Sequence, residues 1–191
     1  MSINIDNFES RNDGMYPGGQ KEKAEKNYIQ PNRKLAEKFL SLLDEGAQGF
    51  TFQLFRESGK ETGGFILNGS LDLHWRNLVS KNQVGFGVFV TVNETDLKGR
   101  KKGNILRPRA VWRDRDRENL PDLPTKPHVT IETSPGKFHE YFFLKDVELD
   151  EWGSIQEALV QEYGSDPGAK DVARVLRLPG FYHQKDPKKP F

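Results

Sequence analysis

The stretch VGFGVFVTVNE, residues 84–94, is the clearest β-strand signal in the sequence. Its apolar residues fall at every second position, which places them on one face of an extended chain: Val84, Phe86, Val88, Val90 and Val92. Outward from this strand, further strands are predicted at residues 49–57, 107–114, 128–134 and 138–144. The last two of these flank the turn SPGK and are predicted to form a hairpin.

Four segments have the apolar spacing of amphipathic helices: residues 32–46, 70–83, 149–164 and 167–178. The first has a predicted apolar side made of Leu35, Phe39, Leu42 and Leu43. Asn32 and Ser70 are suited to cap the first two helices, and Gly164 to end the third. Helices and strands alternate, but a hairpin is present. The expected fold class is therefore α/β or α+β, with helices against one or both faces of a sheet.

Composition limits the classes of function. The chain has 191 residues, which suits one domain with a hydrophobic core, and a formal net charge of +1. Any binding of nucleic acid must therefore rest on local basic patches. The sequence has no cysteine, which excludes disulfides and zinc sites built on thiolates. No signal pattern and no apolar run near the ~20 residues of a membrane span is present, so we expect a cytoplasmic protein without a membrane partner.

Two carboxylates follow an apolar run in VWRDRDREN, residues 111–119. Asp114 and Asp116 are two positions apart, so on an extended chain they project to the same side. Like charges at this spacing repel unless a cation lies between them, and Mg²⁺ or Mn²⁺ prefers such oxygen ligands. The alternative is a solvated surface patch in which the neighbouring arginines neutralise the acids. By the same alternation, Arg113 and Arg115 are expected on the opposite face of the strand.

The stretch TSPGKFHEYFF, residues 133–143, is a second candidate. The turn at Ser134 offers backbone N–H groups to an anion, and Lys137 adds a point charge suited to phosphate. His139 is two residues further on, so it faces the same side as Lys137. The alternative is an ordinary hairpin with an exposed lysine and a histidine packed in the core.

The stretch DVARVLRLPGFYHQKD, residues 171–186, is the third. Asp171 and Arg174 are three apart and face one side of the predicted helix, either as part of a site or as a surface ion pair. Arg177, His183 and Lys185 add positive charge just beyond. An acidic cluster surrounded by cations suits a triphosphate held by metal ions and basic side chains.

Taken in order, the D-x-D pair, TSPGKFH and D-x-x-R-V-L-R-L-P-G resemble the motifs of the archaeo-eukaryotic primase (AEP) superfamily, in particular the RepB-type primases and primase-polymerases of plasmids, phages and other mobile elements. The resemblance covers roughly residues 50 to 186. It implies an RRM-like palm sheet of mixed strands flanked by helices. It also implies a DNA-templated nucleotidyltransferase that makes primers from NTPs or dNTPs on single-stranded DNA.

The resemblance assigns roles to residues. Asp114, Asp116 and Asp171 would bind two Mg²⁺ or Mn²⁺ ions. The nucleotide phosphates would be held by Ser134, Lys137, His139, Arg174 and Arg177. Single-stranded DNA would follow a basic, aromatic-bearing surface, for which the candidates are Arg100, Lys101, Lys102, Lys185 and Trp112. The alternative for Trp112 is a place in the core.

The expected organisation is a flexible arm at residues 1–30 and a catalytic domain at 31–191, without the helical accessory domain or helicase that follows in many relatives. A replicative helicase or such an accessory domain is an expected partner. Two other functions share parts of the pattern: a non-catalytic module that binds single-stranded DNA or an origin, and a D-x-D nucleotide-sugar transferase.

Overall fold

The computed structural model describes residues 29–58, 63–186 and 188–191. Most of the predicted arm at residues 1–30 lies outside them. In chain order the elements are α1 (Arg33–Leu43), β1 (Phe50–Arg56), β2 (Gly64–Gly69), α2 (Leu71–Gln83), β3 (Phe86–Thr91), β4 (Glu94–Thr95), η1 (Lys102–Asn104), β5 (Ile105–Arg107), β6 (Ala110–Arg115), β7 (Val129–Ser134), β8 (Lys137–Phe143), α3 (Leu149–Gln161), η2 (Pro167–Lys170) and β9 (Val175–Arg177). No helix in these ranges is long and apolar enough to cross a membrane.

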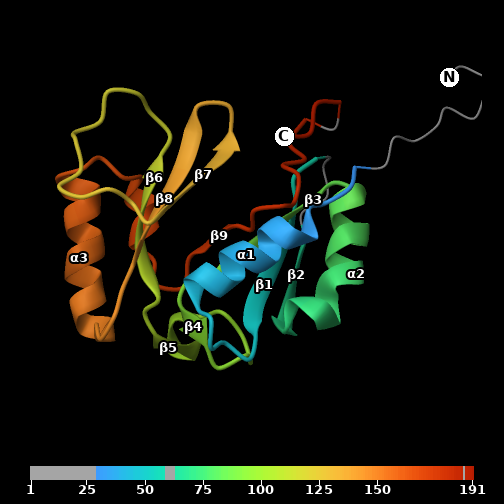
Figure 1. Cartoon of the computed structure of the whole chain (residues 1–191), viewed down its shortest axis with the longest axis horizontal. Helices are drawn as coiled ribbons and strands as arrows, with labels where there is room; N and C mark the ends of the chain where they lie inside the picture. Colours follow the sequence, from blue (N-terminus) through green and yellow to red (C-terminus); the bar gives the residue numbers. More distant parts are fainter. Residues whose placement is uncertain (1–28, 59–62, 187) are drawn as a thin grey trace, which may run out of the picture.

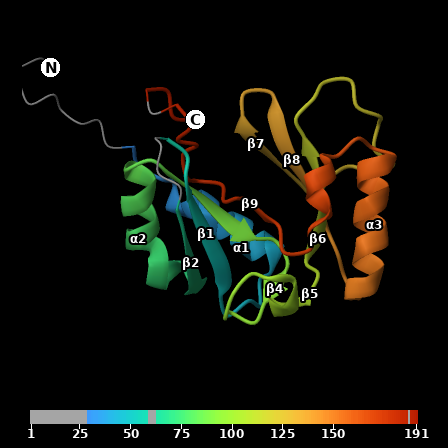
Figure 2. The same ribbon diagram turned by 180° about the vertical axis from the view of Figure 1, so that it is seen from behind.

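One half of the molecule is a four-stranded antiparallel sheet with the order β2-β1-β3-β9. Figure 1 shows α1 in front of this sheet with α2 beside it, and Figure 2 shows the strands from behind. The side chains that alternate toward the helices are fully buried, among them Phe52, Leu54, Val88 and Val90. The core of this half therefore lies between the sheet and one layer of helices.

The other half is a three-stranded antiparallel sheet with the order β6-β8-β7, and α3 packs along β6 at its edge. The Gln156 side chain of α3 accepts from the backbone N–H of Trp112 and donates to its carbonyl, at 3.1 and 2.8 Å. Trp152 donates to the carbonyl of Ala110 at 2.9 Å. These buried bonds fix β6 against α3, and with it the position of the aspartates that follow Trp112.

The two halves are joined by packing and by one buried amide. The rings of Phe39 and Tyr141 meet at 5.1 Å between centroids. The Asn93 side chain accepts from the backbone N–H of Arg109 at 2.9 Å and donates to the carbonyl of Val172 at 3.0 Å. Each of these groups is thereby satisfied in the interior, where an unpaired polar group would cost about 1–3 kcal/mol. The junction is thus specified by polar as well as apolar contacts.

The predicted α+β class is confirmed, although the strands form two main sheets rather than one, and every strand pair in the described ranges is antiparallel. The first three helices are confirmed, and Asn32 and Ser70 cap the first two through Leu35 and Leu73. The buried side of α1 is rotated from the predicted one: Ala36 and Leu40 are buried, whereas Leu35 and Leu42 are exposed.

The prediction of a fourth helix at residues 167–178 is wrong. Residues 167–170 form one 3-10 turn, and Val175–Arg177 form strand β9, which pairs with β3. The Asp171 carboxylate accepts from the backbone N–H of Ala173 at 2.9 Å, a local bond that competes with helix propagation. Valine at 172 and 175 also favours extended chain. Strand β2 was not predicted; it lies at the sheet edge and pairs with β1 alone.

Candidate active site

Asp114 and His139 lie directly opposite each other on the paired strands β6 and β8. The distance from His139 Nε2 to Asp114 Oδ1 is 3.8 Å. Asp116 lies two residues after Asp114, and Lys137 two residues before His139; Asp116 and Lys137 form an ion pair at 3.3 Å. The alternation predicted from the sequence therefore holds: the two acids share one side of β6, as do Lys137 and His139 on β8.

A cavity of about 460 Å³ opens between the two sheets at this point. It is lined by Phe55, Phe89, Arg100, Asp114, Thr133, His139, Asp171, Arg174, Val175, Leu176 and Arg177. Residues from all three predicted motifs thus line one cavity. Asp116, Ser134 and Lys137 are not among the lining residues, and Lys137 and Asp116 are each about half exposed.

The Asp114 carboxylate carries charge that its surroundings do not neutralise. Burial, and after it the charges of Asp116 and Asp166, raise the pKa of Asp114 to about 6, against the opposing influence of Arg174. No group in the described part of the chain donates a hydrogen bond to this carboxylate. A buried, unpaired acid among other acids is a position that a cation would stabilise.

His139 is a neutral imidazole in this setting. Burial, then the positive charges of Arg177 and Arg174, lower the pKa of His139 to about 3. Its Nδ1 is buried and has no hydrogen-bond partner within the described residues. A neutral ring can donate one N–H and accept at the other nitrogen, so His139 offers a hydrogen bond rather than a charge to the cavity.

The two arginines of the third motif differ in their partners. Arg177 is held by a buried ion pair with Glu57 at 2.5 Å, and Glu57 also accepts from the backbone N–H of Gln184 at 2.7 Å. One Arg177 nitrogen, Nη1, is buried without a partner in the described ranges. Arg174 makes no ion pair or side-chain hydrogen bond with the described residues, and it lines the cavity half-buried. Its guanidinium is therefore available to an anion.

The turn at residues 134–137 differs from the prediction. Gly136 has a φ of +76°, as the third residue of a Pro-Gly turn requires, and its N–H donates to Glu132 at 3.1 Å. The Gly136 N–H, which was predicted to face a bound anion, is therefore occupied by the Glu132 carboxylate. Ser134 pairs with Lys137 at the end of the hairpin, while Thr133, beside an irregularity in the strand register, faces the cavity in its place.

The arginines between the two acids point away from the cavity, as predicted. Arg113 forms a buried ion pair with Glu140 at 2.6 Å, and Arg115 contacts the same carboxylate at 3.3 Å. Arg115 also lies over the ring of Phe138, 4.2 Å from its centroid. Arg113 and Arg115 therefore support the opposite face of the sheet, and neither of them pairs with Asp114 or Asp116.

The donor set suits a hard divalent cation in type and charge, because it consists of carboxylate oxygens around an uncompensated buried acid. Asp114 and Asp171 line the same cavity. Within the ranges that the structure describes, however, no three His, Asp or Glu side chains lie close enough together to hold a metal ion. The assignment of Asp114, Asp116 and Asp171 as metal ligands stays a prediction.

Of the residues predicted to bind nucleic acid, Arg100 lines the cavity, where its guanidinium donates to Gln53 at 2.6 Å. Lys101, Lys102 and Lys185 are exposed. Trp112 is fully buried, with its ring 5.5 Å from that of Trp152, so of its two alternatives the place in the core is the one that the structure supports. Trp112 and Asp114 are two positions apart on β6, so their side chains lie on the same face of the strand, Trp112 in the core and Asp114 at the cavity.

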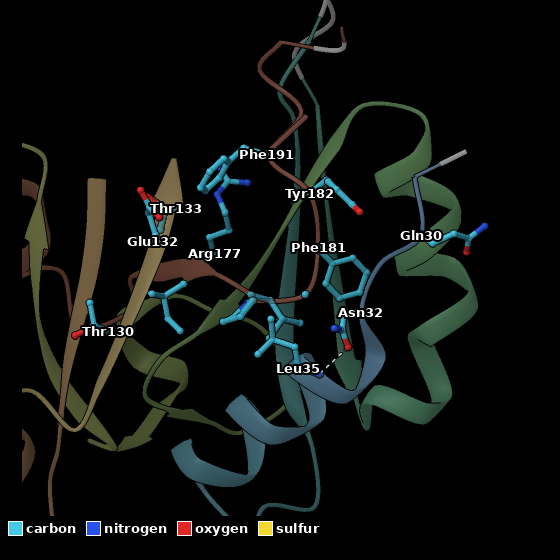
Figure 3. Close-up of a pocket in the computed structure, with 14 residues that line it drawn as sticks. Gln30, Asn32, Leu35, Thr130, Glu132, Thr133, Arg177, Phe181, Tyr182 and Phe191 are labelled. Carbon is cyan, nitrogen blue, oxygen red and sulfur yellow. Dashed lines mark hydrogen bonds between the residues drawn. The ribbon is translucent and has the colours of Figure 1, made fainter. Parts of the chain in front are cut away.

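A second cavity of about 430 Å³ lies behind the first, between α1, β7 and the C-terminal segment (Figure 3). It shares Thr133 and Arg177 with the first cavity. Figure 3 shows Arg177 rising between β7 and the segment that carries Tyr182 and Phe191. Thr133 and Arg177 thus lie at the border of the two cavities.

Residues that sequence reasoning did not assign to the site include Phe55, Phe89 and Thr133. A signal existed for Phe89, which is the one large apolar residue on the glycine-bearing face of the 84–94 strand. For Phe55 and Thr133, the placement depends on how the two sheets approach each other, which no local pattern specifies.

Residues 114–190 match the family model described as the RepB DNA-primase N-terminal domain. The structure is similar to the AEP domain of the primase-polymerase of cyanophage S-2L, with a TM-score of 0.66, 19% identity, and coverage of 82% of this chain and 86% of that one. It is also similar to the catalytic domain of primase RepB′ in complex with initiator DNA, with a TM-score of 0.56, 18% identity, and coverage of 82% and 80%.

A further structure of primase RepB′ has a TM-score of 0.56 and 19% identity, and the match covers 80% of this chain and 51% of that longer one. No curated protein matches the chain. At these identities the solved structures show the fold alone, while the family model matches the segment that holds all three motifs. The resemblance to the RepB-type AEP primases is therefore confirmed.

Proposed function

We propose that this chain is a DNA-templated nucleotidyltransferase, a primase or primase-polymerase that joins NTPs or dNTPs into primers on single-stranded DNA. Its setting would be the replication of a plasmid, phage or other mobile element. The observation that carries the proposal is the convergence of Asp114, His139 and Asp171, one from each predicted motif, on a single cavity that also holds Arg174 and Arg177.

Asp114, Asp116 and Asp171 would hold two Mg²⁺ or Mn²⁺ ions. When bound, such ions activate a 3′-hydroxyl and stabilise the charge that develops on the phosphates. Assembly requires Asp116 to leave Lys137. Because both of these side chains are about half exposed, their ion pair contributes at most about 1 kcal/mol, so the rearrangement costs little.

The remaining residues would hold the triphosphate so that the 3′-hydroxyl attacks the α-phosphorus in line while the bond to pyrophosphate breaks. Arg174 has no competing partner among the described residues, and its planar fork suits phosphate oxygens. Arg177 presents its unpaired Nη1, and His139 donates an uncharged hydrogen bond. Lys137, once released from Asp116, would supply a point charge at the rim, next to Ser134.

Single-stranded DNA would approach over the loop with Arg100, Lys101 and Lys102, since Arg100 joins that loop to the cavity. Lys185 is a second candidate for phosphate contact. The structural likeness to a primase bound to initiator DNA supports this assignment. A replicative helicase or an accessory domain would be the protein partner.

The test is primer synthesis on circular single-stranded DNA with labelled NTPs and dNTPs in parallel, in Mg²⁺ and in Mn²⁺. The proposal requires labelled oligonucleotides and released pyrophosphate that depend on both the template and the metal. A protein that binds the DNA but releases no pyrophosphate under any of these conditions is a binding module, and the proposal is then wrong. Activity with sugar nucleotides in place of NTPs would identify a sugar transferase instead.

A further inference from the structure

The four-stranded sheet has one face without a helix. Side chains alternate along β1, so Phe52 and Leu54 face the helices while Gln53 and Phe55 face the other way. On β3, Phe89 lies opposite Gln53 and therefore shares its face. The two central strands of the sheet, β1 and β3, thus each place one phenylalanine on the face that borders the cavity of Asp114, His139 and Asp171, called the reaction cavity below.

These two phenylalanines are not part of the core. The hydrophobic core cluster and the partly buried residues packed against it, taken over the described ranges, include neither Phe55 nor Phe89. Both rings are half-buried and line the cavity beside Asp114 and Asp171. Large apolar side chains that are withheld from the core and placed in a charged cavity have no packing reason to be there.

The rings form one unit with two arginines. Their centroids are 5.4 Å apart with the planes at 68°, an edge-to-face pair. The guanidinium of Arg100 lies 5.7 Å from the Phe55 centroid, and that of Arg177 lies 4.7 Å from the Phe89 centroid. Aromatic rings and arginine planes together are the surfaces on which unpaired bases stack, and arginine also attracts the phosphates.

We propose that Phe55 and Phe89 form a stacking floor for the bases of single-stranded DNA that enters the reaction cavity, with Arg100 and Arg177 at its two sides. A four-stranded sheet with aromatic rings on its two central strands is a known arrangement for binding single-stranded bases. The proposal rests on the proposed function, since templated synthesis is what brings a DNA strand to this cavity. Stacking of this kind tolerates any base, as a template surface must.

The proposed stacking by Phe55 and Phe89 is tested by measuring the binding of oligonucleotides under conditions without catalysis. Phe55→Leu and Phe89→Leu keep apolar volume but remove the ring, and Phe65→Leu, on the helix-facing side of β2, is the matched control. In EDTA, the affinity for a ten-nucleotide oligo(dA) should fall by about fivefold or more in the first two variants and stay unchanged in the control. The affinity for an abasic oligomer of equal length should not change in any of them. Equal losses for oligo(dA) and the abasic strand, or no loss for either, would overturn the proposal.

A second readout does not depend on the loss of binding. In Phe55→Trp, the added indole fluorescence should be quenched by oligo(dA) but not by the abasic strand, against the background of the wild-type protein, whereas Phe65→Trp should show no such difference. An indole that responds equally to both strands contradicts stacking. Quenching by dATP but not by oligo(dA) assigns the floor to the free nucleotide and overturns its assignment to the strand.

The outcome is separable from that of the proposed function. If the protein binds oligo(dA) through its bases in EDTA but makes no primers in Mg²⁺, the stacking proposal stands and the catalytic proposal is refuted. Primer synthesis that survives in the two leucine variants, with unchanged affinity for oligo(dA), would refute the floor and leave the catalytic proposal standing.

Discussion

Asp114 and His139 face each other across the β6–β8 pair, with 3.8 Å between a carboxylate oxygen and a ring nitrogen, yet they do not neutralise each other. The imidazole is neutral because burial lowers the pKa of His139 to about 3, and burial raises the pKa of Asp114 to about 6. Burial and the neighbouring acids therefore disfavour the ionised form of Asp114. Such groups are typical of positions kept for function at a cost in stability.

Asp114→Asn should stabilise the metal-free protein. The folded-state pKa of Asp114, about 6, lies above the ordinary aspartate value of 3.8, so ionisation opposes folding. The gain should be about 2–3 kcal/mol above pH 6, decline between pH 6 and 4, and vanish below that range. Urea unfolding in EDTA at pH 8 and pH 4.5 measures it.

The matched control is Asp116→Asn, which removes a half-exposed acid with a cationic partner and should change the unfolding free energy by less than about 1 kcal/mol. If Asp114→Asn destabilises the protein at pH 8, the electrostatic description of the site is incorrect.

Arg174→Ala and Arg177→Ala should both weaken nucleotide binding, but only Arg177→Ala should also lower the free energy of unfolding. Arg174 has no ion-pair partner in the described ranges, so its loss should weaken the binding of a non-hydrolysable nucleotide about 10- to 100-fold with little change in stability. Arg177→Ala should weaken binding as well and also leave Glu57 buried without its cation, at a cost of about 3–5 kcal/mol. Calorimetric titration and urea unfolding of both variants test this contrast. Equal stability losses in the two variants would contradict it.

His139→Gln should retain more nucleotide affinity than His139→Ala. The neutral histidine contributes a hydrogen bond, which glutamine can replace, whereas alanine leaves the phosphate oxygen unpaired at a cost of about 1–2 kcal/mol. The Michaelis constant for the nucleotide, measured for both variants at pH 7, is the readout. A glutamine variant as impaired as the alanine variant would indicate a role that depends on charge or on the ring.

Arg113 and Glu140 should behave as a buried ion pair that supports the fold. Removal of Glu140 leaves Arg113 without its carboxylate in the interior and should cost about 3–5 kcal/mol. Removal of Arg113 leaves Glu140 with Arg115 alone and should cost less, and the double replacement should cost clearly less than the sum of the two losses. Denaturant unfolding of Arg113→Met, Glu140→Met and the double variant completes the cycle. Additive losses would show that the two side chains do not interact.

Local patterns in the sequence predicted much of the fold. The capped helices α1 and α2, the 84–94 strand and the hairpin around Pro135 carry their signals in neighbouring residues. Strand β9 did not, because Asp171 to Leu178 has helical spacing, and its extended form depends on pairing with β3. Strand β2 was missed for a similar reason, since it lies at an edge and two of its three apolar side chains, Phe65 and Ile66, stay exposed.

The candidate site was predicted in part. The alternation along β6 correctly placed Arg113 on the face opposite Asp114, whereas the meeting of Asp114 and His139 across β6 and β8 was implied by the family resemblance alone. Asp171 lines the same cavity although it lies on a turn rather than on a helix. The sequence could not predict Phe55 and Thr133 as site residues, because their place in the cavity depends on how two sheets, whose strands are far apart in the sequence, approach each other.

The most direct test of the central claim is template-dependent dinucleotide synthesis by Asp114→Asn beside Asp122→Asn, an exposed acid in the following loop. Both variants should be as well folded as the wild type by circular dichroism. The account predicts that the Asp114 variant loses at least about a thousandfold in rate with Mg²⁺ and with Mn²⁺, while the Asp122 variant keeps the wild-type rate. A folded Asp114→Asn protein that synthesises dinucleotides at the wild-type rate would contradict it.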